Sequence, residues 1–199
     1  IKELSRYPER VDLSDALRPN EENLIAVKVD PHDVGSPRYH MSEDTHSSWF
    51  AGLMRLELTE SVFIDDVFAY ATDVGDPANL RVNLKMDSED GTPFEGEVVA
   101  RATPWYPNEA DEPTAASSTA IKIDGKTEKT IDISIPNPNL WTTGTPNLYK
   151  VWVLIKDREG RVVDDKVVTV GLRTVSQEGG TFRVNGKPSM LNGPLIFGH

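Results

Sequence analysis

Adjacent acidic side chains are the first residues in this sequence whose chemistry could be catalytic. The chain has 32 Asp and Glu residues, and they stand side by side at Glu21-Glu22, Glu43-Asp44, Asp65-Asp66 and Asp164-Asp165. Hydrolysis by a paired acid and nucleophile requires two carboxyl groups about 5–9 Å apart on a rigid scaffold. Neighbouring side chains of a strand point to opposite faces, and those of a turn point to solvent. We therefore interpret these pairs as surface acids rather than as a catalytic dyad.

Metal ligation and nucleophilic catalysis have few candidate residues. His40, Glu43, Asp44 and His46 lie close together in sequence, but one loop that supplies four such residues is usually polar surface. The acidic run 87–91 lacks the glutamate that a calcium-binding loop carries at its twelfth position. The chain has no cysteine, and no Gly-x-Ser-x-Gly segment marks a serine nucleophile. We predict neither a metal site nor a cofactor.

Four aromatic residues stand beside turn-forming residues. Trp105 and Tyr106 lie in the segment 103–117, which is rich in Pro, Ala, Ser and acids. Two interpretations stay open for it: an extended solvated loop, which we favour, or a lid whose aromatic rings stack on a sugar. Trp141 follows a Pro/Asn-rich run, and Tyr149 begins a strong β-rich segment. For these two we predict structural roles, with the Trp closing one end of a sandwich and the Tyr hydroxyl bonded to nearby backbone.

The charge balance excludes two classes of partner. The 21 basic and 32 acidic residues give a net charge of −11 and a pI of about 4.8. This sign repels phosphate backbones and anionic lipid, so we predict no nucleic-acid and no membrane partner. The composition does not fix the compartment, although we favour a periplasmic or secreted location over the cytoplasm.

Short strands at even spacing dominate the chain after residue 61. Gly and Pro, 14 of each, favour turns over a helical bundle, and turn sequences such as Asp124-Gly125 separate the β-rich runs. The expected strands cover 62–72, 80–86, 95–103, 118–123, 129–135, 148–156 and 162–172. Seven such strands without a helix-period segment between them predict an all-β fold, an immunoglobulin-like β-sandwich.

The flanking regions follow different patterns. Before the sandwich, β-rich runs at 24–30 and 53–58 predict two further strands, and 13–17 predicts one helical turn at most. After it, the residues on both sides of Asn185-Gly186 predict a small hairpin. The chain opens without Met or the apolar run of a signal peptide, so we expect it to be a piece of a longer protein.

Four segments, in this order, carry a family resemblance. They read Asn137-Pro138-Asn139-Leu140-Trp141, then Pro146-Asn147-Leu148-Tyr149-Lys150-Val151, then Val170-Gly171-Leu172-Arg173, then Phe182-Arg183-Val184-Asn185-Gly186-Lys187-Pro188. Together with the upstream segments 12–17, 23–29 and 48–55, the sequence resembles glycoside hydrolase family 2. That family includes β-galactosidases, β-glucuronidases and β-mannosidases. The resemblance covers nearly the whole chain.

The resemblance implies a position inside a larger retaining β-glycosidase. Residues 1–60 would be the C-terminal part of a jelly-roll domain with a sugar-binding-like fold. Residues 61–174 would be the immunoglobulin-like domain, and 175–199 the entry segment of a (β/α)₈ catalytic domain. The family's catalytic glutamates lie downstream of this point. The chain alone is therefore expected to be inactive, with no catalytic residue of its own.

The resemblance also suggests residues and partners. Asp44 and His199 are the substrate-contacting candidates, although the chain reads Asn192-Gly193 where the family usually has Arg-Gly. A carbohydrate substrate would bind through the parent protein's other domains. The apolar runs in residues 1–60 would pack on the sandwich 61–174 or pair with a second copy, with disorder of the first ~20 residues as a third alternative; we favour a homodimer formed through that segment. The alternative function is a free-standing carbohydrate-binding or adhesion module that uses Trp105 and Tyr106.

Overall fold

The computed structural model describes residues 10–28, 54–89 and 91–190. The chain divides into two compact units, Ile1–Leu56 and Glu57–His199. Most of the first unit lies outside the described residues, and every strand of the described chain belongs to the second unit. No helix in the described part of the chain is long and apolar enough to cross a membrane.

The described residues of the first unit form two short turns, at 14–16 and at 19–20, and no strand. The amides of Ala16 and Leu17 both donate to the carbonyl of Leu13, which confirms one helical turn at most. The two β-rich runs predicted before the sandwich are wrong where they are described, because 22–28 and 54–60 form no strand. A strand exists only when its backbone pairs with another strand, and apolar sequence alone does not supply that partner. Leu24 accordingly is 94% exposed.

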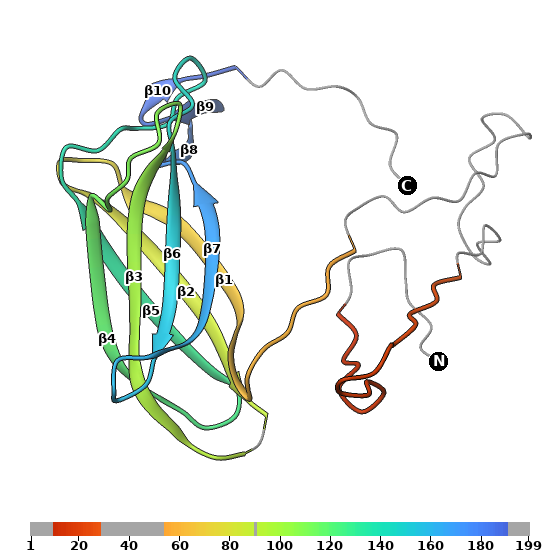
Figure 1. Ribbon diagram of the computed structural model, residues 1–199. Coiled ribbons are helices and arrows are strands. Elements are labelled where there is room, and N and C mark those ends of the chain that lie inside the picture. The colour runs from red at the N-terminus through yellow and green to blue at the C-terminus, as the bar shows by residue number, and fades with distance from the viewer. Residues whose placement is uncertain (1–9, 29–53, 90, 191–199) are drawn as a thin grey trace, which may run out of the picture. The chain divides into compact units, whose positions relative to one another are not determined.

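Two antiparallel sheets pack face to face in the second unit (Figure 1). One sheet has three strands in the order β1-β2-β5, and the other has four in the order β4-β3-β6-β7. The strands are β1 Val62–Asp73, β2 Ala78–Ser88, β3 Phe94–Tyr106, β4 Ala115–Ile123, β5 Thr127–Ile135, β6 Leu148–Lys156 and β7 Val162–Val170. The predicted seven-stranded immunoglobulin-like sandwich is therefore confirmed.

The core follows from strict alternation along the strands. In β2 every second residue from Ala78 to Ser88 is buried, and the residues between them are less buried or exposed. β5 behaves alike from Ile131 to Ile135. Because successive side chains of a strand point to opposite faces, each sheet buries one apolar face between the layers.

A bulge interrupts this alternation in β1. The register of β1 against β2 shifts between Ile64 and Asp66. Val62 and Ile64 face the core before the shift, and Val67, Ala69 and Ala71 pack against it afterwards. One extra residue in the strand thus exchanges the inward and outward sets of side chains.

Two charged side chains from β7 hold the backbone at this bulge. The amide of Ile64 donates to Asp164 Oδ2 at 2.7 Å. Lys166 Nζ donates to the carbonyls of Ile64 and Asp65 at 2.9 and 3.0 Å. β1 is an edge strand of its sheet, and these contacts satisfy backbone groups that its neighbour β2 does not reach. Asp164 is therefore a structural acid that joins the two sheets.

Beyond the sandwich lies a three-stranded ribbon, labelled β8–β10 in Figure 1. Its strands are β8 Val175–Glu178, β9 Thr181–Val184 and β10 Lys187–Pro188. The predicted hairpin at Asn185-Gly186 is confirmed, and both turn residues have positive φ, 50° and 74°. β8 was not predicted, because its four residues are all exposed and carry no alternating pattern.

Removal of the Asp164 carboxylate should weaken the joint between the sheets. We expect Asp164→Ala to lower the free energy of unfolding by about 1–3 kcal/mol, because the Ile64 amide loses its acceptor. Urea denaturation followed by tryptophan fluorescence measures the change. The matched control is Asp165→Ala, since this neighbouring acid is exposed and its removal should cost no more than about 0.5 kcal/mol. Equal losses in the two variants would contradict the structural role of Asp164.

Candidate functional site

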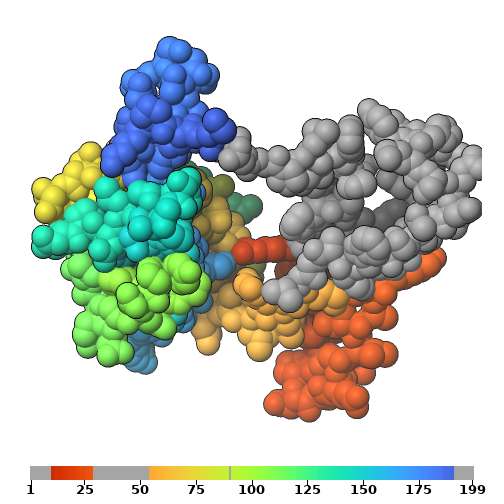
Figure 2. All heavy atoms as spheres, turned by 90° about the horizontal axis from the view of Figure 1, so that it is seen from above, coloured from red at the N-terminus to blue at the C-terminus, as the bar shows by residue number. Residues whose placement is uncertain are grey.

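The loops that could form a site gather at one end of the sandwich. The end of β3 pairs with the start of β6 through Pro104 and Tyr149, and Tyr149 also faces Val170 at the end of β7. The amide of Asn137 donates to Asp76 Oδ1 at 2.9 Å, which brings the β1–β2 loop to the same place. Figure 2 looks down on this end, with the ribbon β8–β10 in blue.

Tyr149 ties the crossover from β5 to β6 to the core. Its side chain is only 1% exposed, and its hydroxyl accepts a hydrogen bond from the amide of Asn139 at 2.9 Å. A buried Tyr hydroxyl requires a polar partner, and the crossover backbone supplies it. The predicted structural role of Tyr149 is confirmed.

Trp141 closes the end of the sandwich beside β7. Its amide donates to the carbonyl of Leu172 at 2.9 Å, and its side chain packs so close to Gly171 that a Cβ there would lie 2.8 Å from it. The guanidinium of Arg173 lies over the Trp141 ring, 4.4 Å from the ring centroid. These contacts confirm the structural role predicted for Trp141 and explain why the chain needs glycine at position 171.

Asn185 fastens the ribbon β8–β10 to this aromatic contact. Its Nδ2 donates to the carbonyl of Trp141 at 2.9 Å, and its Oδ1 accepts from the amide of Thr174 at the same distance. Its own amide donates to the carbonyl of Thr174. Asn tolerates a positive φ better than most residues, so Asn185 can occupy the turn while its side chain attaches the ribbon to Trp141. The sequence marks Asn185 as a turn residue and Arg173 as a member of a family segment, but it does not predict the contact of either residue with Trp141.

Trp105 and Tyr106 do not form a lid. The predicted loop 103–117 is wrong in its bounds, because β3 continues through Tyr106 and β4 begins at Ala115. Pairing with β6 extends β3 beyond what its Pro104 suggested. Lys150 Nζ lies 5.2 Å from the centroid of the Trp105 ring and pairs with Glu109 at 2.6 Å. Trp105 is half-buried, and Tyr106 is 49% exposed.

The acids with displaced pKa values serve structural contacts. Hydrogen bonds from the Ser14 amide and hydroxyl lower the pKa of Asp12, and the Arg81 guanidinium lowers that of Asp132. Burial by itself would raise the pKa of Asp157, but hydrogen bonds from Arg161 and Glu159 outweigh it and the pKa falls. A glycosidase general acid needs the opposite shift, a raised pKa.

The predicted substrate-contacting residues, Asp44 and His199, lie outside the described residues. So do His40, Glu43 and His46, which lie close to Asp44 in sequence. Within the part of the chain that the structure describes, no group of three or more His, Asp or Glu side chains could hold a metal ion.

These observations define a class: an immunoglobulin-like domain whose polar residues position loops and join sheets. The family model "Glycosyl hydrolases family 2" matches residues 62–173, which is the whole sandwich and more than half of the chain. The chain belongs to glycosyl hydrolase family 2.

The relatives are long enzymes of which this chain matches a small part. It is 30% identical over 197 residues to a β-galactosidase of Enterobacter cloacae and 28% identical over 210 residues to one of Photobacterium profundum. Each match covers 95% of this chain but 18% of the relative. The chain thus spans about a fifth of the length of these curated relatives.

Solved structures show the same fold. A family 2 member from Bacteroides cellulosilyticus DSM 14838 superposes with a TM-score of 0.61 at 20% identity, covering 68% of this chain and 19% of that one. A Bacteroides uniformis β-glucuronidase gives a TM-score of 0.55 at 19% identity, covering 68% of this chain and 17% of that one. The sandwich architecture is shared at low sequence identity.

Loss of the Asn185 amide donor should loosen the ribbon without unfolding the sandwich. Asn185→Asp retains the acceptor for Thr174 but removes the donor to the Trp141 carbonyl and places a negative charge beside it. We expect amides of residues 174–190 to exchange with deuterium at least several-fold faster, while those of β3 and β6 keep their protection. Mass spectrometry of exchanged peptides measures this.

The matched control for this variant is Asn108→Asp, which adds the same charge at an exposed loop position. Faster exchange of the ribbon in both variants would assign the effect to charge. Unchanged exchange in Asn185→Asp would show that the Trp141 contact does not hold the ribbon.

Proposed function

We propose that this chain is the non-catalytic β-sandwich region of a retaining, β-galactosidase-like glycosidase that hydrolyses O-glycosidic bonds. One observation carries the proposal. β-Galactosidases match 95% of this chain, yet the chain accounts for only 18% of their length. The chemistry of the parent protein is therefore assigned to the remaining part, and this chain supplies its framework.

The contacts at the end of the sandwich support a positioning role. Trp141, Arg173 and Asn185 fix the ribbon β8–β10 to the sandwich through packing and hydrogen bonds. In the proposed arrangement this ribbon leads into the catalytic domain. A ribbon attached at defined points would hold that domain in one orientation relative to the sandwich.

The proposed domain arrangement has three parts. Residues 1–60 would be the end of a jelly-roll domain, 61–174 the immunoglobulin-like domain and 175–199 the entry of a (β/α)₈ catalytic domain. The division of the chain near residue 56 and the match to residues 62–173 support the first two limits. Asp44 and His199 remain the proposed substrate contacts of the parent enzyme.

The alternative function, a free-standing carbohydrate-binding module using Trp105 and Tyr106, has less support. The Lys150 ammonium lies over the Trp105 ring and is held there by Glu109, so a sugar would compete with this cation for that face of the ring. The family match and the relatives' lengths also favour a part of an enzyme.

Glycosidase assays of the chain and of the parent protein distinguish a framework role of this chain from a catalytic role. The 199-residue chain should release no product above background from a panel of chromogenic β-glycosides, because the proposal assigns the acid and nucleophile groups to the remaining part of the parent protein. The parent protein should cleave a β-galactoside, and NMR of the first product should show the β-anomer. Turnover by the 199-residue chain that survives repurification and is abolished by a point change within it would overturn the proposal. Inversion by the parent protein would reject the retaining mechanism.

We also propose a homodimer formed through residues 1–60. Apolar side chains of this segment are solvent-exposed, Leu24 by 94% and Leu58 by 82%, and a self-complementary contact would cover them in both copies. Sedimentation velocity at micromolar concentration should show a dimer that Leu24→Asp dissociates. Val175→Asp is the control, because Val175 is 58% exposed but lies in β8. A clean monomer, or a dimer insensitive to Leu24→Asp, would reject the proposed contact.

A further inference from the structure

The outer face of the β1-β2-β5 sheet carries aligned rows of aromatic and polar side chains. Cross-strand register places Phe68 opposite Asn83 and Asn83 opposite Thr130. The next row runs from Tyr70 through Arg81 to Asp132. Side chains at paired positions share one face, so each row crosses the sheet from an aromatic ring to hydrogen-bonding groups.

The two aromatic rings form one continuous surface on β1. Phe68 and Tyr70 have ring centroids 5.4 Å apart and ring planes tilted by 33°. Phe68 is 61% exposed, the most exposed aromatic side chain among the large exposed hydrophobic residues of the described chain. Such exposure loses the free energy that burial of a Phe ring normally provides, so a partner that covers the ring would recover it.

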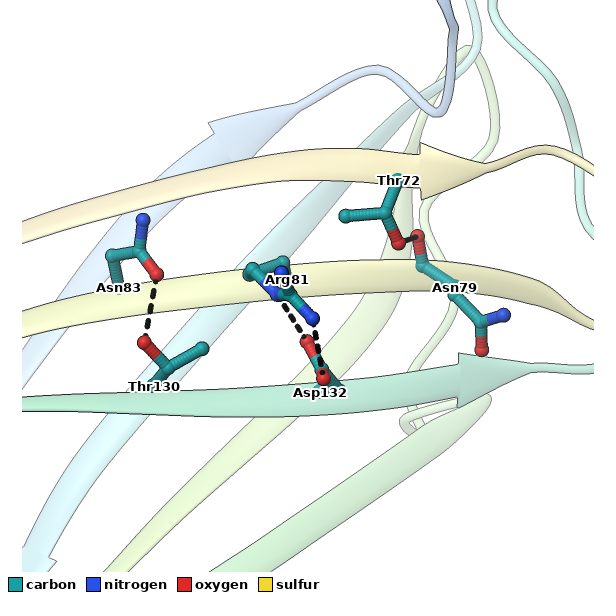
Figure 3. A network of polar contacts seen from close by, with 6 residues as sticks. All are labelled: Thr72, Asn79, Arg81, Asn83, Thr130 and Asp132. Carbon is teal, nitrogen blue, oxygen red and sulfur yellow. Dashed lines mark hydrogen bonds and ion pairs between the residues drawn. The ribbon is translucent and has the colours of Figure 1, made fainter.

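The polar groups beside the rings are held in place by each other, as Figure 3 shows. The Arg81 guanidinium donates from Nε and Nη2 to the two carboxylate oxygens of Asp132, at 2.8 and 3.0 Å. Thr130 Oγ1 donates to Asn83 Oδ1 at 3.0 Å. These bonds leave the Asn83 amide nitrogen as a donor and fix its direction. A ligand would therefore meet an ordered polar surface rather than mobile side chains.

A shallow hollow adjoins the exposed ring. Its volume is about 410 Å³, and it is lined by Asp66, Phe68, Asn83, Leu84, Lys85, Glu128, Lys129 and Thr130. Asp66 faces Lys85 and Lys85 faces Glu128 across the strands, so cationic and anionic groups alternate. The hollow thus offers donors and acceptors in similar measure beside one flat apolar ring.

This combination selects one ligand chemistry. A polyanion would be repelled by Asp66 and Glu128, and an apolar segment would leave the charged groups without solvent or partners. A pyranose ring has a C–H face that packs on an aromatic ring and equatorial hydroxyls that both donate and accept hydrogen bonds. We propose that the outer face of β1, β2 and β5 binds a neutral oligosaccharide strand, with one sugar stacked on Phe68 and its hydroxyls on Asn83, Thr130 and Lys85.

This site is separate from the proposed catalytic function. It would retain a polymeric substrate near the enzyme, and it needs no group outside the sandwich. Activity of the parent protein on small chromogenic glycosides tests the proposed function, whereas binding to the 199-residue chain tests this site. Either can fail without the other.

The experiment is a ¹⁵N NMR titration of the 199-residue chain with three neutral probes at millimolar concentration: cellohexaose, laminarihexaose and β-1,4-galactohexaose. At least one should shift amides of residues 66–70, 81–85 and 128–132. Phe68→Ala should weaken that binding about tenfold, which is the loss expected for one aromatic contact. Thr130→Val, which retains shape but removes the hydroxyl, should weaken it by a smaller factor.

The matched control is Trp152→Ala. Trp152 is 42% exposed on the outer face of the other sheet, and its removal should leave binding unchanged. Thermal melting verifies that each variant is folded. Absence of shifts with all three probes, shifts centred on Trp152, or binding insensitive to Phe68→Ala would overturn the proposal. Concentration-dependent shifts of the same face without any sugar would overturn it in favour of contact between two copies.

Discussion

The hydrogen bond between the Asn139 amide and the Tyr149 hydroxyl is the contact on which the organised end of this domain depends. Tyr149 is buried in β6, so its hydroxyl has no access to bulk water and must bond to protein. By accepting from Asn139 it fixes the crossover that carries Trp141. Trp141 then packs on Gly171 and lies under Arg173, and its carbonyl receives Asn185. One buried phenol thus determines where the ribbon β8–β10 attaches.

The bulge in β1 links the contacts that join the two sheets to the aromatic rings on the outer face of β1. Asp164 and Lys166 hold the backbone of Ile64 and Asp65, where the extra residue enters the strand. Beyond it, the alanines at 69 and 71 face the core and the rings of Phe68 and Tyr70 do not. Without the bulge the same period-two pattern would turn both rings inward. The joint between the sheets therefore also decides that the proposed sugar-binding face exists.

The acidic residues of this glycosyl hydrolase family 2 chain illustrate how a framework differs from a catalytic domain. Asp164 accepts from a backbone amide, Asp132 pairs with Arg81, and Asp157 binds Arg161 and the adjacent turn. For Asp132 and Asp157 these contacts lower the pKa, so the ionised carboxylate is the stabilised form. A general acid of a glycosidase requires an environment that stabilises the protonated form instead. These acids are suited to joining strands and turns, which agrees with a positioning role in the proposed parent enzyme.

The sequence by itself determined the sandwich. Alternation of apolar and polar residues and the turn residues between strands are local signals, and they can be recognised without knowing which strands pair. The seven strands, the Asn185-Gly186 turn and the roles of Trp141 and Tyr149 were all predicted from such signals. The strands predicted at 24–30 and 53–58 are wrong over their described parts, 24–28 and 54–58, since apolar residues do not reveal whether a pairing strand is present. Asp44 and His199 stay predictions. The function of Asp164, the attachment made by Asn185 and the outward turn of Phe68 were decided only by tertiary structure. The first two depend on residues 100 and 44 positions away in the chain, and the third depends on a bulge, so none of them leaves a local trace in the sequence.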